Sequence, residues 1–154
     1  MDNLIRDYLI KEFDNFKVYL LPNQYHPCHS YITPKNKKYR DFFQLPENER
    51  NEASFIELKL AEAIKIVLNS KTEDKKPMSD FELAIEMKTF YYSQRSELQI
   101  QLAPRHAKPV LFGKTKFVDS TFGKSGTYPD RFKIDDFAFH DIRNSLMEKL
   151  EMRL

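Results

Sequence analysis

Apolar residues recur at helical spacing in three stretches of the chain. Residues 47–70 follow Pro46 without another Gly or Pro and are rich in good helix formers, which predicts a long central helix. A short amphipathic N-terminal helix is predicted from the positions of Leu4, Ile5, Tyr8, Leu9 and Phe13. A C-terminal helix is predicted from the stripe of Phe139, Ile142, Leu146, Leu150 and Leu154.

The remaining ordered stretches have the pattern of β-strands. Strands are predicted at 16–21, 29–33, 80–92, 97–102 and 110–118. The segments 80–92 and 97–102 alternate with a period of two and are joined by a short polar link, so they predict a hairpin. Residues 39–45 favour one or two helical turns, and 132–139 either a last strand or the entry to the C-terminal helix. The order is typical of an α+β fold, mainly an antiparallel sheet packed against a long central helix and N- and C-terminal helices.

Size and composition limit the class of protein. With 154 residues, 41% hydrophobic and 14% aromatic, the chain is expected to form a single domain over residues 1–154 with a real core. Cys28 is the only cysteine, which excludes an internal disulfide and favours a thiol-reducing compartment. The charged N-terminal stretch does not fit a signal peptide, and no membrane span is expected, so a cytoplasmic location is predicted.

Positive charge is concentrated in the second half of the chain. The segment 95–133 holds eight basic residues against three acidic ones, and a glycine-containing stretch at 119–131 predicts a mobile loop. We expect these cations to bind an anionic partner, either an acidic protein surface or nucleic acid. The interleaved Phe and Tyr also fit a half-buried strand with Phe inward and Lys outward. The partner-binding candidates are Arg105, Lys108, Lys114, Lys116, Lys124, Arg131 and Lys133.

One acidic residue lies on the apolar side of the central helix. On a helical wheel Glu57 falls among Leu60, Ile64 and other apolar residues, so this carboxylate is expected to be paired, protonated or next to a polar pocket. In the following strand, alternation places Glu86 and Lys88 on the same face.

Glu57 on a helix with Glu86-Met87-Lys88 on the next strand resembles the PD-(D/E)xK nuclease constellation over about 30 residues. The resemblance implies carboxylates that hold a divalent cation and a lysine that orients the attacking water and stabilises charge on the phosphate. Asp80 is a poor substitute for the second metal carboxylate, because it lies on the same strand as Glu86. The alternative interpretation is an exposed same-face pair of Glu86 and Lys88.

A compact cluster of His26, Cys28 and His29 offers zinc ligands, with His106 or His140 as a distant fourth. The spacing matches no standard zinc finger, and the alternative is an ordinary loop with Cys28 as a small buried hydrophobe. No resident metal is therefore predicted.

The sequence favours a non-catalytic binding or regulatory protein, of an inhibitor or immunity type, that docks an anionic partner through segment 95–133. The alternatives are a metal-dependent nuclease that uses Glu57, Glu86 and Lys88, and an RNA- or single-stranded-DNA-binding protein. No cofactor is expected, apart from a divalent cation in the nuclease alternative.

Overall fold

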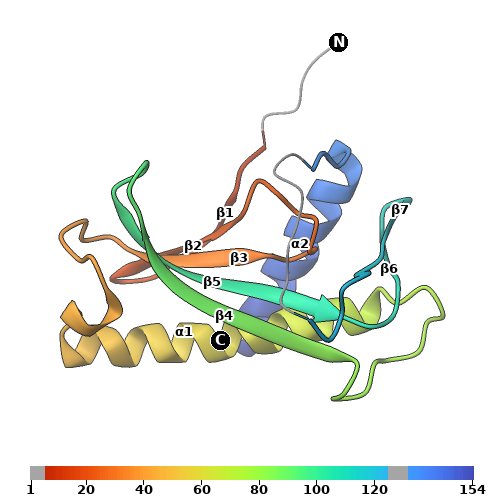
Figure 1. Cartoon of the computed structure of the whole chain (residues 1–154), viewed down its shortest axis with the longest axis horizontal. Coiled ribbons are helices and arrows are strands. Elements are labelled where there is room, and N and C mark those ends of the chain that lie inside the picture. Colours follow the sequence, from red (N-terminus) through yellow and green to blue (C-terminus); the bar gives the residue numbers. More distant parts are fainter. Residues whose placement is uncertain (1–5, 125–131) are drawn as a thin grey trace, which may run out of the picture.

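A five-stranded antiparallel sheet lies at the centre of the computed structural model, which describes residues 6–124 and 132–154 (Figure 1). The strand order is β1-β2-β3-β5-β4, so β5 is an inner strand and β4 an edge strand. The strands are β1 Leu9–Glu12, β2 Phe16–Leu20, β3 Ser30–Pro34, β4 Leu83–Tyr92 and β5 Glu97–His106. The α+β class and the predicted hairpin of β4 and β5 are confirmed.

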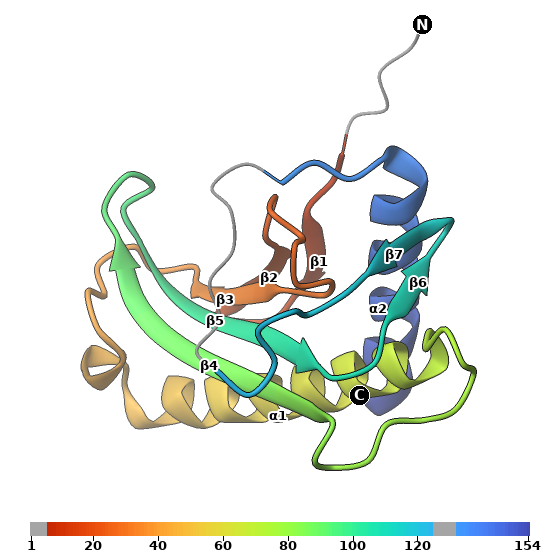
Figure 2. The ribbon, with the colours of Figure 1, turned by 45° about the vertical axis from the view of Figure 1, so that its right-hand side comes forward.

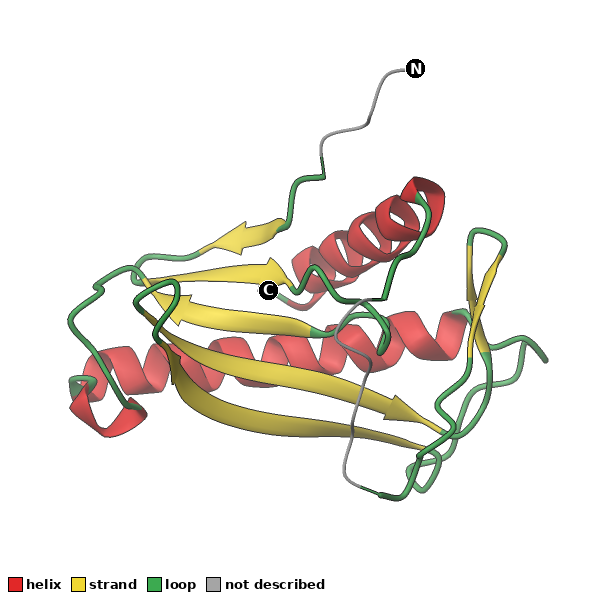
Figure 3. Cartoon of the chain, turned by 45° about the horizontal axis from the view of Figure 1, so that its top comes forward, coloured by secondary structure: helices red, strands yellow, loops and turns green. Residues whose placement is uncertain are grey.

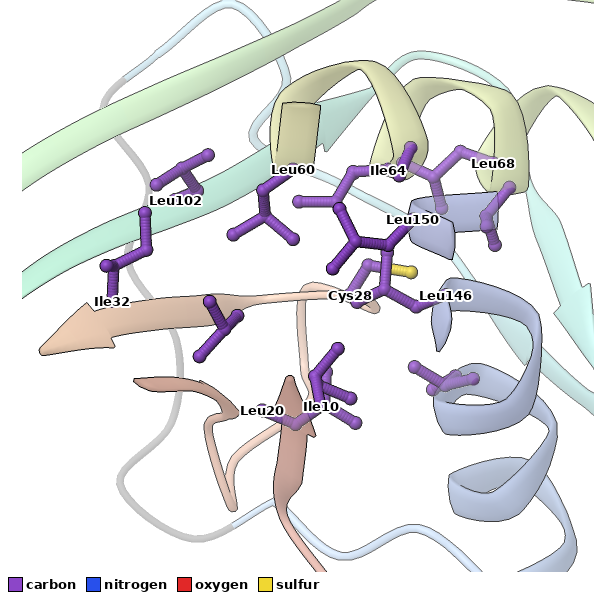
Figure 4. Close-up of a cluster of buried hydrophobic side chains, with 14 of the residues drawn as sticks. Ile10, Leu20, Cys28, Ile32, Leu60, Ile64, Leu68, Leu102, Leu146 and Leu150 are labelled. Carbon is purple, nitrogen blue, oxygen red and sulfur yellow. The ribbon is translucent and has the colours of Figure 1, made fainter. Parts of the chain in front are cut away.

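Helices α1 (Glu47–Ser70) and α2 (Asp136–Arg153) cover one face of this sheet (Figures 2 and 3). Because side chains alternate along a strand, every second residue points to the helices. Figure 4 shows Ile32 and Leu102 of the sheet facing Leu60 and Ile64 of α1. All four are fully buried or within 1% of it, which makes this layer the core.

The helix boundaries follow from local chemistry. Pro46 precedes the first residue of α1, and Glu47 and Glu49 lie at the positive end of the helix dipole. The Asp135 side chain accepts a hydrogen bond from the Ala138 amide and caps the start of α2. The segment 132–139 therefore contains the entry to the C-terminal helix and no strand.

The predicted strand 110–118 is a hairpin of two short strands, β6 (Val110–Phe112) and β7 (Thr115–Phe117). Gly113 has a φ of 59° in the turn, a conformation that costs glycine little. Phe112 and Phe117 are buried and anchor the hairpin to the core. A single 3₁₀ turn, η1 (Phe42–Gln44), occupies the stretch where one or two helical turns were predicted.

The prediction of an N-terminal helix is wrong. Leu9–Glu12 forms β1, which pairs antiparallel with β2, while residues 1–5 lie outside the described part of the chain. Ile10, which is outside the predicted helical stripe, is the buried residue of this strand. Pairing with an available strand edge outweighs a weak helical pattern over one short segment.

No helix in residues 6–124 and 132–154 is long and apolar enough to cross a membrane.

The core between the helices and the sheet predicts different losses of stability when two leucines of α1 are replaced by alanine. Leu60 is fully buried, whereas Leu58 is 56% exposed. We expect Leu60→Ala to lower the free energy of unfolding by about 2 to 5 kcal/mol, because it leaves a cavity in the core. Leu58→Ala is expected to change it by less than about 1 kcal/mol. Urea denaturation followed by circular dichroism measures both, and equal losses would contradict this description of the core.

Candidate functional site

The face of the sheet opposite the helices carries a row of polar side chains along β5. Glu97, Gln99 and Gln101 alternate with Leu98, Ile100 and Leu102, whose side chains enter the core. Glu97 and Gln99 are only 6% and 3% exposed although they face away from the helices. Neighbouring residues therefore cover this row, and its polar atoms need partners.

Aromatic side chains flank the row on both sides. Tyr31 of β3 is paired with Gln101, and Phe90 and Tyr92 of β4 are paired with Gln99 and Glu97. These three rings, Gln99, Gln101 and Arg95 are among the residues that line a cavity of about 600 Å³, here named the open-face cavity. Arg95 belongs to the turn between β4 and β5 and lies at the Glu97 end of the row.

A second cavity of about 510 Å³ adjoins it and shares Tyr31 and Arg95. Its lining adds Glu97, Lys37 and Tyr19, whose ring stacks on Tyr31 with centroids 5.3 Å apart. Arg95 and the ion pair of Lys37 with Glu97 thus lie where the two cavities meet.

Hydrogen bonds join the polar row into one chain. Gln101 Nε2 donates to Gln99 Oε1 at 2.9 Å, and Gln99 Nε2 donates to Glu97 Oε1 at 2.9 Å. Lys37 Nζ donates to the other oxygen of Glu97 at 3.0 Å. Burial, with the negative charge of Glu97, raises the pKa of Tyr31 to about 12, so its hydroxyl stays protonated at neutral pH.

Three buried histidines lie beyond the Gln101 end of the row. His26, His29 and His106 are each exposed by 2% or less, and the His26 and His29 ring centroids are 6.4 Å apart. The neighbouring Gln101 side chain raises the pKa of His29, an effect smaller than that of burial. Burial lowers the pKa of all three, that of His29 to about 3, so the cluster is neutral at physiological pH.

Arg105 joins this end of the sheet to the segment after β7, which crosses near the end of β5 in Figure 2. Its guanidinium forms a two-pronged ion pair with Asp119 at 2.7 and 3.0 Å. It also donates to the carbonyl oxygens of Thr121 and Lys124 and to Glu86. Burial raises the pKa of Asp119, but the hydrogen bonds and charge of Arg105 outweigh it, and the pKa lies below its usual range.

The structure does not bring together the three residues of the nuclease alternative. Glu57 lies in a separate cavity of about 380 Å³ with Met87 and Thr89, which belong to the helix-facing set of β4. Burial raises the pKa of Glu57. Glu86 is on the opposite face and pairs with Arg105, while the Lys88 ammonium lies 5.3 Å from the centroid of the Phe90 ring.

Three of the predicted partner-binding residues are occupied by acidic neighbours. Arg105 is buried against Asp119, Lys108 pairs with Asp74 at 2.9 Å and Lys116 with Glu73 at 3.2 Å. Lys114, Lys124 and Lys133 are exposed, and Arg131 lies outside the described residues. The predicted mobile loop 119–131 is described only as far as Lys124, and Arg105 holds that part to the sheet.

The residues of the polar row were missed by the sequence analysis. The signal was present, because residues 97, 99 and 101 are polar at alternate positions of a strand whose other positions are apolar. Such a pattern is normally interpreted as a solvent-facing side. The aromatic neighbours that bury the row come from other strands, and no local pattern shows them.

In the described part of the chain, no three His, Cys, Asp or Glu side chains are arranged to hold a metal ion. Cys28 belongs to the hydrophobic core, where its sulfur lies among apolar side chains (Figure 4), and burial raises the pKa of its thiol. The interpretation of Cys28 as a small buried hydrophobe agrees with this position.

Solved structures share this architecture. A hypothetical histidine triad nucleotide-binding protein from Sulfolobus tokodaii strain 7 superposes with a TM-score of 0.59 over 96% of this chain and 86% of its own, at 14% identity. A Zn-bound histidine triad family protein from Mycobacterium smegmatis gives 0.53 over 94% and 86%, at 13% identity. The fold is histidine-triad-like. No family model and no curated protein matches the sequence.

The histidine-triad-like fold corrects the function predicted from the sequence. The sequence predicted an inhibitor or immunity-type protein that docks through segment 95–133, with a nuclease or RNA-binding protein as alternatives. The likeness to two histidine triad proteins, one of them described as nucleotide-binding, contradicts this prediction. The physical reason is that charges counted along the chain are neutralised across it, as at Lys108 and Lys116. An acidic protein surface or nucleic acid as partner stays a prediction.

The buried ion pair of this histidine-triad-like fold predicts a large effect of Arg105→Met on stability. The side chain of Asp119 is 0% exposed, so it would keep a buried charge without its counterion. We expect the free energy of unfolding to fall by about 3 to 5 kcal/mol. Glu86→Gln, at a side chain that is 47% exposed, is expected to cost less than about 1 kcal/mol. Chemical denaturation measures both, and a loss for Arg105→Met as small as for Glu86→Gln would contradict a buried ion pair.

The neutral histidine cluster predicts acid sensitivity. The pKa of His29 is about 3 in the folded protein and near 6.5 when unfolded, so the unfolded chain binds the extra proton. The stabilisation is complete above about pH 6.5 and is lost as pH falls toward 3, at up to about 1.4 kcal/mol per pH unit. We expect the unfolding free energy of the His29→Gln variant to fall less steeply between pH 7 and 5 than that of the wild type. Equal slopes in urea titrations would show that His29 does not carry this effect.

Proposed function

We propose that this protein binds a nucleotide in the open-face cavity. The observation that supports the proposal is the composition of the lining, in which aromatic rings from β3 and β4 flank two amide side chains of β5. The histidine-triad-like fold, shared with a protein described as nucleotide-binding, points in the same direction.

The cavity offers contacts for both the base and the phosphate of a nucleotide. A base has two flat faces and a polar edge, and it fits between Tyr31 and Phe90 with its edge toward the amides of Gln99 and Gln101. A phosphate fits the end of the cavity where Arg95 lies, with Lys37 nearby on the adjoining cavity.

The proposal is one of binding. Among the described residues that line the open-face cavity there is no histidine, cysteine or serine to form a covalent nucleotidyl intermediate. The buried cluster of His26, His29 and His106 belongs to the neighbouring end of the sheet, where the charges of Arg105 and Asp119 act on His26 and His106.

Calorimetric titration with nucleoside monophosphates tests the proposal. We expect binding by the wild type and about tenfold weaker binding by Arg95→Ala, because a charge-assisted hydrogen bond to phosphate is lost. Lys37→Ala is expected to weaken binding in the same direction. Lys38→Ala is the matched control, because Lys38 is an exposed neighbour of Lys37 that is not among the described residues lining either cavity.

Two outcomes would reject nucleotide binding in this cavity. One is the absence of any heat or thermal shift with all monophosphates at millimolar concentration. The other is a loss of affinity in Lys38→Ala equal to that in Arg95→Ala, which would indicate general charge attraction.

A further inference from the structure

The amides of the polar row all point the same way along β5. Gln101 donates from its nitrogen to the oxygen of Gln99, and Gln99 donates from its nitrogen to Glu97. Each amide nitrogen is therefore on the Glu97 side of its residue and each amide oxygen on the His29 side.

Glu97 is the group that fixes this direction. Its carboxylate is ion-paired with Lys37 and only accepts hydrogen bonds, so Gln99 must present its NH₂ group to it. The oxygen of Gln99 then faces Gln101, which must donate in turn. The oxygen of Gln101 is left at the other end of the row, on the side of His29, whose pKa this side chain raises.

A directed amide presents an ordered pair of groups to a ligand. Each NH₂ group has a second N–H and each amide oxygen a second lone pair, which the row itself does not use. Gln101 is the more exposed of the two amides and lines the open-face cavity next to Tyr31. A ligand edge above Gln101 thus meets a donor toward Glu97 and an acceptor toward His29.

The cationic end of the cavity orients a nucleotide over this pair. Arg95 lines the cavity at the Glu97 end, whereas Lys88, which is paired with Gln101 on the neighbouring strand, is not among the described residues that line it. The phosphate and ribose therefore point toward the Glu97 end, and the far side of the base points toward His29. In adenine, N7 is the acceptor near the ribose and the 6-amino group is the donor away from it, which is the order that a glutamine amide recognises. A 6-oxopurine presents an acceptor at both positions and would place its oxygen against the amide oxygen of Gln101.

We propose that Glu97 is a specificity-determining residue that directs the amide row so that the open-face cavity selects 6-aminopurine nucleotides over 6-oxopurine nucleotides. This inference rests on the proposed nucleotide binding. Glu97 acts through Gln99 and Gln101 and is a positioning residue, because its own oxygens are taken by Lys37 and Gln99.

The affinities for AMP and IMP, which have the same size and phosphate, test this role. The wild type is expected to bind AMP about tenfold more tightly than IMP, the discrimination of one good bidentate contact. In Glu97→Gln the side chain either donates or accepts, so the row loses its fixed direction, and the ratio is expected to fall below about threefold. Glu148→Gln, on the exposed side of α2, is the control and is expected to keep the ratio of the wild type.

A second variant keeps the test valid if Glu97→Gln does not fold. Gln101→Met removes the proposed contact and is also expected to bring AMP and IMP within about threefold of each other, with AMP weakened and IMP nearly unchanged. Side-chain amide resonances of Gln99 and Gln101 in ¹⁵N spectra give a direct readout of the row. They are expected to shift together in Glu97→Gln and to stay unchanged in Glu148→Gln.

The outcomes separate the two proposals. If no monophosphate binds, the proposed function fails and this inference fails with it. If AMP and IMP bind the wild type equally, or if Glu97→Gln and Gln101→Met keep the full preference, nucleotide binding stands and the role of Glu97 is overturned.

Discussion

The two-sided character of β5 is the constraint on which the rest of the structure depends. This inner strand sends Ile100 and Leu102 into the core and Gln99 and Gln101 to the opposite face, and both sets are largely covered. An inner strand of an open sheet usually has one wet side. Here polar groups are removed from water on that side, so each must find a partner within the protein or in a ligand.

The protein meets this requirement with charge at the two ends of the strand and neutral groups between them. At one end Glu97 pairs with Lys37, and at the other Arg105 pairs with Asp119 and donates hydrogen bonds to the carbonyl oxygens of Thr121 and Lys124. Between these ends, two amides continue from Glu97 and follow the direction that it imposes. An amide costs much less to desolvate than an ion, and a chain of amides strengthens each of its hydrogen bonds.

The sequence predicted those elements whose causes are local. The helix at 47–70 and the pairing of β4 with β5 depend on a long uninterrupted pattern and on a short link, and both are present. The helix expected near the N-terminus failed because Ile10 is buried by pairing with β2, which a period of three or four does not reveal. The nuclease hypothesis placed Glu57 of the helix and Lys88 of the strand in one site. Glu57 lies beside Met87 and Thr89 on the helix-facing side of β4, whereas alternation along β4 puts Lys88 on the opposite side of the sheet.

The candidate site could be predicted from local sequence patterns even less than the fold could. Lys37, Tyr31 and Glu97 come from three parts of the chain, and the β3–β5 pairing that unites them spans about 70 residues. Counting charge along 95–133 assigned function to cations that the fold neutralises, such as Arg105, and overlooked the uncharged glutamines beside them. A histidine-triad-like fold supplies the sheet and its covered face, but the chemistry there belongs to the residues that this chain places on β5. Because those residues are amides that do not titrate, the proposed recognition in the cavity depends on the direction of hydrogen bonds, which Glu97 fixes through Gln99 and Gln101.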